Sequence, residues 1–337
     1  MDKNTAAFIM PVKIAGNETE IRFFREAVES IKRQTDDDWI IIMADDRSDV
    51  KVVYDAIDEI KRDLKDKLHV IYSEKNNGAG GARNIGILYA DEIGAPFILF
   101  NDSDDISDPR RLELVRKAFE EDEAANVVYT GFDVIDENGD IVPLDKVSAP
   151  VRDIIKGHST NIVEGENAWI SIAIDKNYTN LTSCTAVRTS LAVAELFPLQ
   201  SVSEGAHTWY RYAAHPGKFV FLRDIKGSYR ICSNVQSRSR SVNVNFYEKK
   251  FYADSAGFEE AVRIAKEYGT MGGYDENDIR TGFFVRLGFC LLIGGSEEYC
   301  KKSLDKALAV SKEKTLEYID QLYCAPEYKE SLKAMVN

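Results

Sequence analysis

The stretch Phe97-Ile98-Leu99-Phe100-Asn101-Asp102-Ser103-Asp104-Asp105 joins an apolar run to three carboxylates in four positions. The run is too short for a helix and predicts a buried strand over Phe97–Phe100. Carboxylates this close together repel one another unless they are solvated or bound to a cation, and divalent hard cations prefer oxygen ligands. The stretch therefore predicts a strand that ends at a divalent-metal site formed by Asp102 and Asp104.

Helix capping is the alternative use for acidic side chains in this stretch. A helix is predicted to begin near Pro109-Arg110, and either Asp105 or Asp108 is placed to accept hydrogen bonds from its first N–H groups. Capping accounts for one or two carboxylates and leaves Asp102 and Asp104 to the metal.

Strand and helix patterns alternate before this stretch. Apolar runs predict three earlier strands, at Ala6–Val12, at 39–44 and at Leu68–Tyr72. A capping-box pattern at Asn17 and Glu20 begins the first helix. Alternation with short links predicts an α/β fold with a mostly parallel, Rossmann-like sheet and helices on both faces.

Polar segments follow the second, third and fourth predicted strands. They are Asp45-Asp46, a glycine-rich segment at 77–84 and the acidic cluster at 102–105. Ligands of open parallel sheets bind outside the carboxyl ends of the strands. We therefore expect the three segments to meet at one crevice.

The glycine-rich segment Asn77-Gly78-Ala79-Gly80-Gly81-Ala82-Arg83-Asn84 is predicted to form a loop that leads into a helix. This is the context of a dinucleotide fingerprint, but Arg83 stands at the third glycine position and no acidic ribose partner follows. A plain tight turn is the alternative. An arginine at a helix start beside open N–H groups suits an anion such as a diphosphate.

The second half of the chain carries weaker patterns. Strands are predicted at 126–134, 218–222 and 227–231, a hairpin turn at 137–140 and a helix at 204–214. The 141–180 segment carries weak signals and is expected to include a mobile loop, and helices are expected from about Phe246 to the end.

Composition limits the class of protein. The 337 residues carry 43 Lys and Arg against 56 Asp and Glu, a net charge of −13, which argues against a nucleic-acid binder. The charge is uneven: 101–140 holds 13 acidic and four basic residues, whereas 215–250 holds eight basic and two acidic ones. Five Cys without a close pair exclude a disulfide framework and favour a cytoplasmic protein.

Membrane signals are weak. The polar start of the chain predicts no secretory signal, and no apolar run approaches the roughly 18 residues of a membrane helix. The nearest candidate, 282–295, is interrupted by Arg286 and predicts a buried amphipathic helix, with peripheral membrane contact as the alternative.

Taken together, these segments resemble a family 2 glycosyltransferase with the A-type fold, a nucleotide-diphospho-sugar transferase. Order and spacing match over about residues 7–115. The matching motifs are Pro11-Val12, Ala27-Val28-Glu29-Ser30-Ile31, Gln34-Thr35, Ala44-Asp45-Asp46-Arg47-Ser48, Asn77-Gly78, Ala82-Arg83-Asn84-Ile85-Gly86 and Phe100-Asn101-Asp102-Ser103-Asp104-Asp105.

The resemblance implies roles for these motifs. Pro11-Val12 and Asp45-Asp46 would hold the nucleotide base, and Arg83 would serve the nucleotide. Asp102-Ser103-Asp104 would be the D-x-D motif, with Asp102 and Asp104 binding the ribose and the Mn²⁺ or Mg²⁺ on the diphosphate.

The catalytic base departs from the family pattern. The segment 203–211 lies where members carry Glu-Asp before a hydrophobic helix and an Arg, but Gly205 replaces the Asp. Glu204 is the nearest carboxylate and His207 is the rival candidate, since a base must reach the acceptor hydroxyl. The alternatives are a helix-start charge for Glu204 and a packing or surface histidine for His207, while Trp209 is expected in the core or as an acceptor platform.

The segment 229–239 resembles the family's loop after the last core strand, where members often carry Arg-x-His. Here Cys232 replaces the His, and because soft sulfur suits Mg²⁺ and Mn²⁺ poorly, packing is expected for it. Arg230, Arg238 and Arg240 are expected to close over the diphosphate as a flap, or else to form a solvated basic loop.

The sequence and the resemblance together predict a metal-dependent glycosyltransferase that moves a sugar from a nucleotide-diphosphate sugar, a UDP-sugar, to a hydroxyl on a glycan, lipid-linked or protein acceptor. Inversion at the anomeric carbon is implied by the resemblance alone. Residues 1–243 are expected to form the catalytic domain, with a nucleotide-binding half at 1–115 and an acceptor half at 116–243. The helical region 244–337 would complete the acceptor site or form a homodimer. The rivals are a nucleotidyltransferase and a non-catalytic sugar-nucleotide-binding scaffold.

Overall fold

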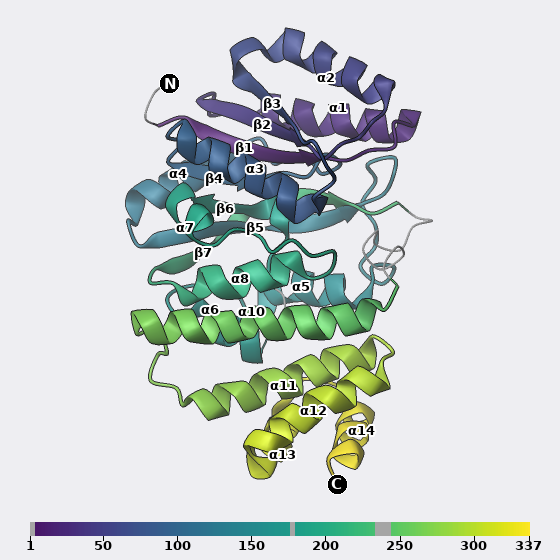
Figure 1. Ribbon diagram of the computed structural model, residues 1–337, viewed down its shortest axis with the longest axis vertical. Coiled ribbons are helices and arrows are strands. Elements are labelled where there is room, and N and C mark those ends of the chain that lie inside the picture. Colours follow the sequence, from purple (N-terminus) through teal and green to yellow (C-terminus); the bar gives the residue numbers. More distant parts are fainter. Residues whose placement is uncertain (1–3, 176–178, 233–243) are drawn as a thin grey trace.

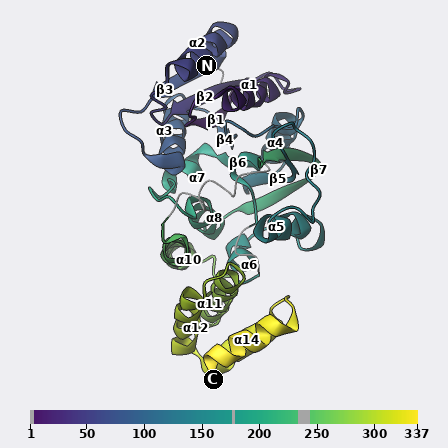
Figure 2. The same cartoon turned by 90° about the vertical axis from the view of Figure 1, so that its right-hand side faces the viewer.

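The computed structural model describes residues 4–175, 179–232 and 244–337. One seven-stranded sheet with helices on both faces lies at one end of the molecule, and a stack of helices continues from it to the C-terminus (Figure 1). Figure 2 shows α10 between these two parts.

The sheet contains strands from both halves of the chain. The strands are β1 Ala6–Val12, β2 Trp39–Asp45, β3 Leu68–Tyr72, β4 Phe97–Phe100, β5 Ala125–Ile135, β6 Thr185–Arg188 and β7 Lys218–Arg230. Their order across the sheet is β3-β2-β1-β4-β6-β5-β7, and only β6 runs antiparallel to its neighbours. The predicted mostly parallel α/β sheet is confirmed.

Helices connect and cover these strands. They are α1 Glu18–Lys32, α2 Lys51–Leu64, α3 Gly78–Glu92, α4 Arg111–Glu121, α5 Ala149–Thr160, α6 Ala168–Ile174, α7 Thr189–Ala194, α8 Glu204–Ala214, α10 Phe246–Tyr268, α11 Glu276–Ile293, α12 Glu297–Val310, α13 Lys312–Gln321 and α14 Pro326–Val336, with short 3₁₀ turns at Lys65–Lys67 and Thr182–Cys184.

Alternation along the strands divides the core between the two faces of the sheet. On β1, Phe8 points into a cluster with α1, α2 and α4, whereas Ile9 points into a cluster with α3, α7 and α8 that continues into the C-terminal helices. Both side chains are fully buried. Period-two burial on both faces explains why these strands appear in the sequence as continuous apolar runs.

The glycine-rich segment forms the N-cap and the first two turns of α3 rather than a loop, so the prediction of a loop was wrong. Close approach explains the glycines: a Cβ on Gly80 would lie 2.9 Å from the carbonyl oxygen of Pro198, and one on Gly86 would lie 2.6 Å from a methyl group of Ile9 on β1. The small residues let α3 lie close to both the sheet and the 195–203 segment.

The second half of the chain differs from the prediction in two places. The four-residue strand β6 was not predicted, whereas 141–180 contains the short helices α5 and α6 together with loop. The two strands expected at 218–222 and 227–231 are one strand, β7, whose register with β5 shifts between Leu222 and Lys226. That irregularity is why the sequence pattern breaks there.

The C-terminal helices extend the second core cluster away from the sheet. Helix α10 packs along α8, and a Cβ on Gly257 of α10 would lie 2.7 Å from the Cα of His207 on α8. Helix α11 buries most of its apolar residues in the same cluster, as expected for 282–295. Among the described residues, no helix is long and apolar enough to span a membrane.

Candidate active site

Three segments that are far apart in the sequence meet at the carboxyl edge of the sheet through Arg83. Its Nη2 lies 2.8 and 3.1 Å from the two carboxylate oxygens of Asp102, and its Nη1 lies 3.5 Å from Oε1 of Glu204. Asp102 follows β4, and Glu204 is the first residue of α8. The structure therefore joins the predicted nucleotide residue, the predicted metal ligand and the candidate base in one cluster.

Burial makes the Arg83 contacts strong. The Arg83 side chain is 5% exposed, and its guanidinium lies 5.4 Å from the ring centre of Phe197. Hydrogen bonds between charged groups are shorter and stronger than neutral ones, and the planar guanidinium fixes the direction of each. Arg83 thus orients the Asp102 carboxylate, whose side chain remains 29% exposed.

Asn84 fixes the 195–203 segment to α3. Its side-chain amide donates to the carbonyl of Phe197 and accepts from the N–H of Phe197, both at 2.8 Å. This segment leads directly into α8, so the two bonds set where Glu204 stands relative to Arg83. The sequence analysis quoted Asn84 within a motif but gave it no role; an amide side chain directly after Arg83 was the only signal.

The acidic cluster divides into exposed and buried carboxylates. Asp102 and Asp104 are half-buried, whereas Asp105 is 2% exposed and its Oδ1 accepts the N–H of Arg230 at 2.9 Å. Burial, and then the neighbouring Asp104 and Asp102, raise the pKa of Asp105 well above its ordinary range. Asp105 therefore has a structural role: its buried carboxylate attaches the 102–105 segment to the end of β7.

Neither Asp105 nor Asp108 caps α4. Oδ1 of Asp108 accepts the N–H of Arg110 at 2.8 Å in the turn before the helix, whereas Oε1 of Gln34 accepts the N–H of Leu112 in the first helical turn, also at 2.8 Å. The prediction that Asp105 or Asp108 caps this helix was therefore wrong. Capping does not involve Asp102 or Asp104.

The donor set of the acidic cluster suits a hard divalent cation. Mg²⁺ is commonly held by one or two carboxylates together with phosphate oxygens of the substrate, and a half-buried pair such as Asp102 and Asp104 supplies such ligands. Within 4–175, 179–232 and 244–337, no group of three or more His, Cys, Asp or Glu side chains is arranged to hold a metal by itself. The residues present therefore fit a cation that is shared with a phosphate ligand.

Asp45 and Asp46 both have partners within the chain. Asp45, at the end of β2, accepts from the hydroxyl of Ser48 at 2.6 Å. Asp46 accepts the N–H groups of Asn77 and Gly78 at 2.7 and 2.9 Å, which caps α3. Burial raises the pKa of Asp46, and the two backbone hydrogen bonds oppose that rise.

Pro11 and Val12 are buried at the end of β1, and the carbonyl oxygen of Val12 accepts the N–H of Asp46 at 2.8 Å. Pro11 and Val12 pair with Ala44 and Asp45 across the parallel ladder. The four residues assigned to the base therefore do lie together, and their contact with a base stays a prediction.

The two candidate bases on α8 have different surroundings. Glu204 is 25% exposed and faces Arg83 and the start of α3, where its Cγ lies 3.7 Å from the position of a Cβ on Gly80. His207 is 7% exposed and packs against α10, and its Nδ1 has no hydrogen-bond partner among the described residues. Burial, and then Arg211, lower the pKa of His207 to about 4. These surroundings favour Glu204.

The low pKa of His207 gives a testable pH dependence. A group whose pKa falls from roughly 6.5 in the unfolded chain to about 4 in the folded chain stabilises the fold fully above pH 6.5, and this stability is lost as the pH falls toward 4. We expect His207→Gln to remove up to about 3 kcal/mol of the loss in unfolding free energy between pH 7 and pH 4. Urea unfolding of both proteins at the two pH values measures it; equal losses would contradict it.

The remaining predicted residues lie in different places. Ser103, which lies between Asp102 and Asp104 in the sequence, is buried. Trp209 is fully buried in the core, which was one of the two positions expected for it. Cys232 is half-buried just beyond β7. Arg238 and Arg240 lie outside the described residues.

Arg230 does not follow the expected pattern. Its guanidinium donates to the carbonyl oxygens of Asp104 and Asp136 and to the carboxylate of Glu26. The side chain is 2% exposed. It is therefore held within the protein rather than presented as part of a flap.

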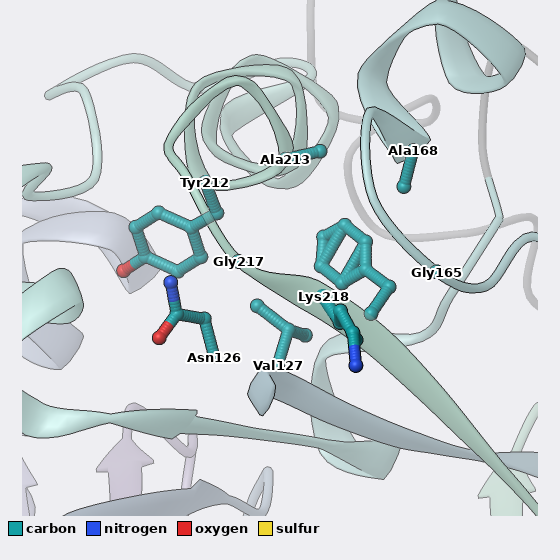
Figure 3. A pocket seen from close by; sticks show the side chains of 9 residues that line it. Asn126, Val127, Gly165, Ala168, Tyr212, Ala213, Gly217 and Lys218 are labelled. Carbon is teal, nitrogen blue, oxygen red and sulfur yellow. The ribbon is translucent and has the colours of Figure 1, made fainter. Parts of the chain in front are cut away.

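A small cavity lies at the other end of β5 and β7 (Figure 3). Its volume is about 10 Å³, which is room for roughly one water molecule. Its lining residues are Asn126, Val127, Gly165, Ala168, Tyr212, Ala213, Gly217, Lys218 and Phe219. The cavity is too small for a sugar or a nucleotide, so it does not compete with the edge at Arg83 as the candidate site.

Solved structures with similar folds carry nucleotide sugars. The structure of S. aureus TarS residues 1–349 in complex with UDP-GlcNAc has a TM-score of 0.57 at 16% identity and covers 95% of this chain and 93% of that one. A mannosyltransferase of Pyrobaculum calidifontis in complex with GDP-Man and Mn²⁺ has a TM-score of 0.53 at 15% identity and covers 98% and 78%. At these identities the likeness shows the A-type fold alone.

Sequence relatives match a little under half of the chain. An uncharacterized glycosyltransferase of Methanocaldococcus jannaschii, MJ1057, is 33% identical over 143 residues, 42% of this chain and 46% of that protein. One of Nostoc, alr2836, is 28% identical over 156 residues, 46% of each chain. The chain therefore spans about half the length of these curated relatives.

A family model matches a longer part of the chain. The model of glycosyl transferase family 2 covers residues 9–179, just over half of the 337 residues. This range includes Asp45, Asp46, Arg83, Asp102 and Asp104, and ends before Glu204. On this match the chain belongs to glycosyl transferase family 2.

Proposed function

We propose that this chain is a metal-dependent glycosyltransferase that moves a sugar from a nucleoside-diphosphate sugar, a UDP-sugar, to an acceptor hydroxyl with inversion. The observation that carries the proposal is the Arg83 cluster, which joins the acidic cluster to a carboxylate on another helix. A transferase needs a donor site and a base within reach of one another. Family membership supports the same activity.

The donor would bind along the carboxyl edge of the sheet. Pro11, Val12, Asp45 and Asp46 would enclose the base. Asp102 and Asp104 would hold Mn²⁺ or Mg²⁺ against the diphosphate, with Asp102 kept in place by Arg83. When bound, the cation would neutralise the negative charge that develops on the leaving diphosphate.

Glu204 would accept the proton of the acceptor hydroxyl, whose oxygen attacks the anomeric carbon while the bond to the diphosphate breaks. Attack opposite the leaving group inverts the anomeric centre. The 3.5 Å contact of Glu204 with Arg83 uses Oε1, so Oε2 would be the oxygen that accepts the proton. Arg83 would thus hold the base, Glu204, in a fixed position relative to Asp102 in the donor site.

The C-terminal helices would serve the acceptor. We propose that the catalytic domain comprises 1–243 and that the 244–337 region completes the acceptor site or forms a homodimer. The close packing of α10 on α8, next to His207, supports the first role because it sets the position of the helix that carries Glu204. The acceptor class would be a glycan, a lipid-linked group or a protein, and the protein would act in the cytoplasm or at a membrane surface.

Donor hydrolysis without an acceptor tests the proposal. The protein would be incubated with UDP-sugars and Mn²⁺, with EDTA as the control, and the products separated by anion exchange. We expect slow release of UDP that depends on Mn²⁺. Release of pyrophosphate in a parallel reaction supplied with UTP and a sugar 1-phosphate would instead identify a nucleotidyltransferase. No product from any UDP-sugar or GDP-sugar, or from the parallel reaction, would favour the scaffold, which the replacement of the usual Asp by Gly205 makes the second candidate.

A further inference from the structure

Arg230, the last residue of β7, connects four segments of the chain at the back of the acidic cluster. Its main-chain N–H donates to Oδ1 of Asp105 at 2.9 Å, and its Nε donates to the carbonyl oxygen of Asp104 at 2.9 Å. Its Nη1 donates to the carbonyl oxygen of Asp136 at 3.1 Å, beyond the end of β5. Its Nη2 lies 2.7 Å from the Glu26 carboxylate on α1.

The guanidinium is also enclosed by an aromatic ring. It lies 4.2 Å from the ring centre of Phe23 on α1, and the side chain is 2% exposed. A guanidinium bears five N–H donors in a fixed plane, so the bonds from Nε, Nη1 and Nη2 together determine its orientation. A ligand phosphate would have to break these contacts in order to take the place of a carbonyl or of Glu26.

We propose that Arg230 is a positioning residue for the metal-binding loop: it holds the backbone of Asp104 and the side chain of Asp105 and does not contact the diphosphate. This inference rests on the proposed function, in which the loop binds the cation of a metal-bound nucleotide. The two bonds to adjacent residues fix the peptide between them, and this sets the direction in which the Asp104 side chain leaves the backbone. Glu26 and Phe23 hold the guanidinium in turn.

Two substitutions separate this role from a direct phosphate contact. Arg230→Met keeps the apolar packing on Phe23 but removes the three side-chain hydrogen bonds. Arg230→Lys keeps a positive charge that can bind a phosphate, but a single ammonium cannot reproduce the planar set of donors. A positioning role requires both variants to fail, whereas a phosphate contact would let Lys retain much of the affinity.

Arg188 supplies a matched control. It donates to the carbonyl oxygens of Phe119, Asp122 and Ala125 and lies 4.8 Å from the ring centre of Phe119. It is thus another arginine that holds main-chain carbonyls beside a phenylalanine, but at the opposite end of the strands. Arg188→Met therefore measures how much the loss of such an arginine changes exchange and nucleotide binding when the arginine is remote from the acidic cluster.

The first readout is hydrogen–deuterium exchange in protein without nucleotide. We expect faster exchange in peptides that cover 101–106 for Arg230→Met and Arg230→Lys, relative to wild type and Arg188→Met. Unchanged exchange there in both variants would overturn the positioning role. This readout does not depend on whether the chain binds a nucleotide.

The second readout is the dissociation constant for UDP with Mn²⁺ and with EDTA. We expect both Arg230 variants to weaken binding in Mn²⁺ by about ten-fold or more, which is the scale of a hydrogen bond to a charged group. Binding in EDTA should weaken by less than about two-fold, because without the cation the loop contributes little to affinity. Equal weakening in both conditions, or near-normal binding by Arg230→Lys, would overturn the inference in favour of a direct contact. Wild-type protein that binds no nucleoside diphosphate would refute the proposed function instead.

Discussion

Asp104→Ala should abolish the Mn²⁺-dependent part of nucleoside diphosphate binding. In the proposed site the Asp104 carboxylate is one of two protein ligands to the cation, and the phosphate oxygens alone do not hold that cation against the protein. Loss of one charged, hydrogen-bonding ligand at a metal site is expected to cost at least about 100-fold in affinity, since second-shell changes alone cost about 10–100-fold. Isothermal titration of UDP with Mn²⁺ and with EDTA measures the effect.

Asp108→Ala is the matched control for that experiment. Asp108 is an aspartate four residues further on whose carboxylate accepts the N–H of Arg110 in the turn before α4. Its loss should lower the free energy of unfolding by at most about 1 kcal/mol, the net contribution of one hydrogen bond, and leave UDP binding unchanged. Equal binding isotherms for wild type and Asp104→Ala would exclude Asp104 as a metal ligand.

Glu204→Gln should leave donor binding intact and reduce turnover by roughly 10²–10⁴-fold, the usual contribution of a general base. Glutamine keeps the shape of the side chain and an oxygen that can accept from Nη1 of Arg83, so the cluster itself should persist. Only the ability to take up a proton is lost. The measurement is the rate of sugar transfer or of donor hydrolysis, beside the dissociation constant for UDP.

Glu164→Gln provides the comparison. Glu164 is an exposed carboxylate that pairs with Arg223 at 2.6 Å, away from the Arg83 cluster. Its substitution should change neither binding nor rate. Turnover by Glu204→Gln at the wild-type rate would show that another group removes the proton.

Local patterns made the first half of the fold predictable. The strands β1, β2, β3 and β4 are short apolar runs bounded by polar residues, and the helix that begins after Asn17 is capped as the sequence indicates, with the Asn17 side chain accepting the N–H of Glu20. The rule that ligands bind at the carboxyl ends of parallel strands placed Asp45, Asp46 and the acidic cluster on one edge. No knowledge of tertiary packing was needed for these steps.

Long-range contacts decided the parts that the sequence did not predict. Strand β6 is four residues long and belongs to the sheet because its neighbours β4 and β5 pair with it. The partner of Arg230, Glu26, is 204 residues away along the chain. The glycines of α3 were predicted to form a loop because their actual role depends on residues of other elements. Pro198 and Ile9 lie so close to α3 that a Cβ at Gly80 or Gly86 would clash with them.

Thermal unfolding of the wild-type chain with a panel of nucleotides and nucleotide sugars, each with Mn²⁺ and with EDTA, tests the central claim most directly. A ligand that binds only the folded state adds about 2.7 kcal/mol of stability at 100 times its dissociation constant. The account predicts that a nucleoside diphosphate or a nucleotide sugar raises the midpoint of unfolding clearly more in Mn²⁺ than in EDTA. The largest increase is expected with UDP or a UDP-sugar. If no nucleoside diphosphate or nucleotide sugar stabilises the protein in either condition, the proposed donor site at Asp102, Asp104 and Arg83 is wrong.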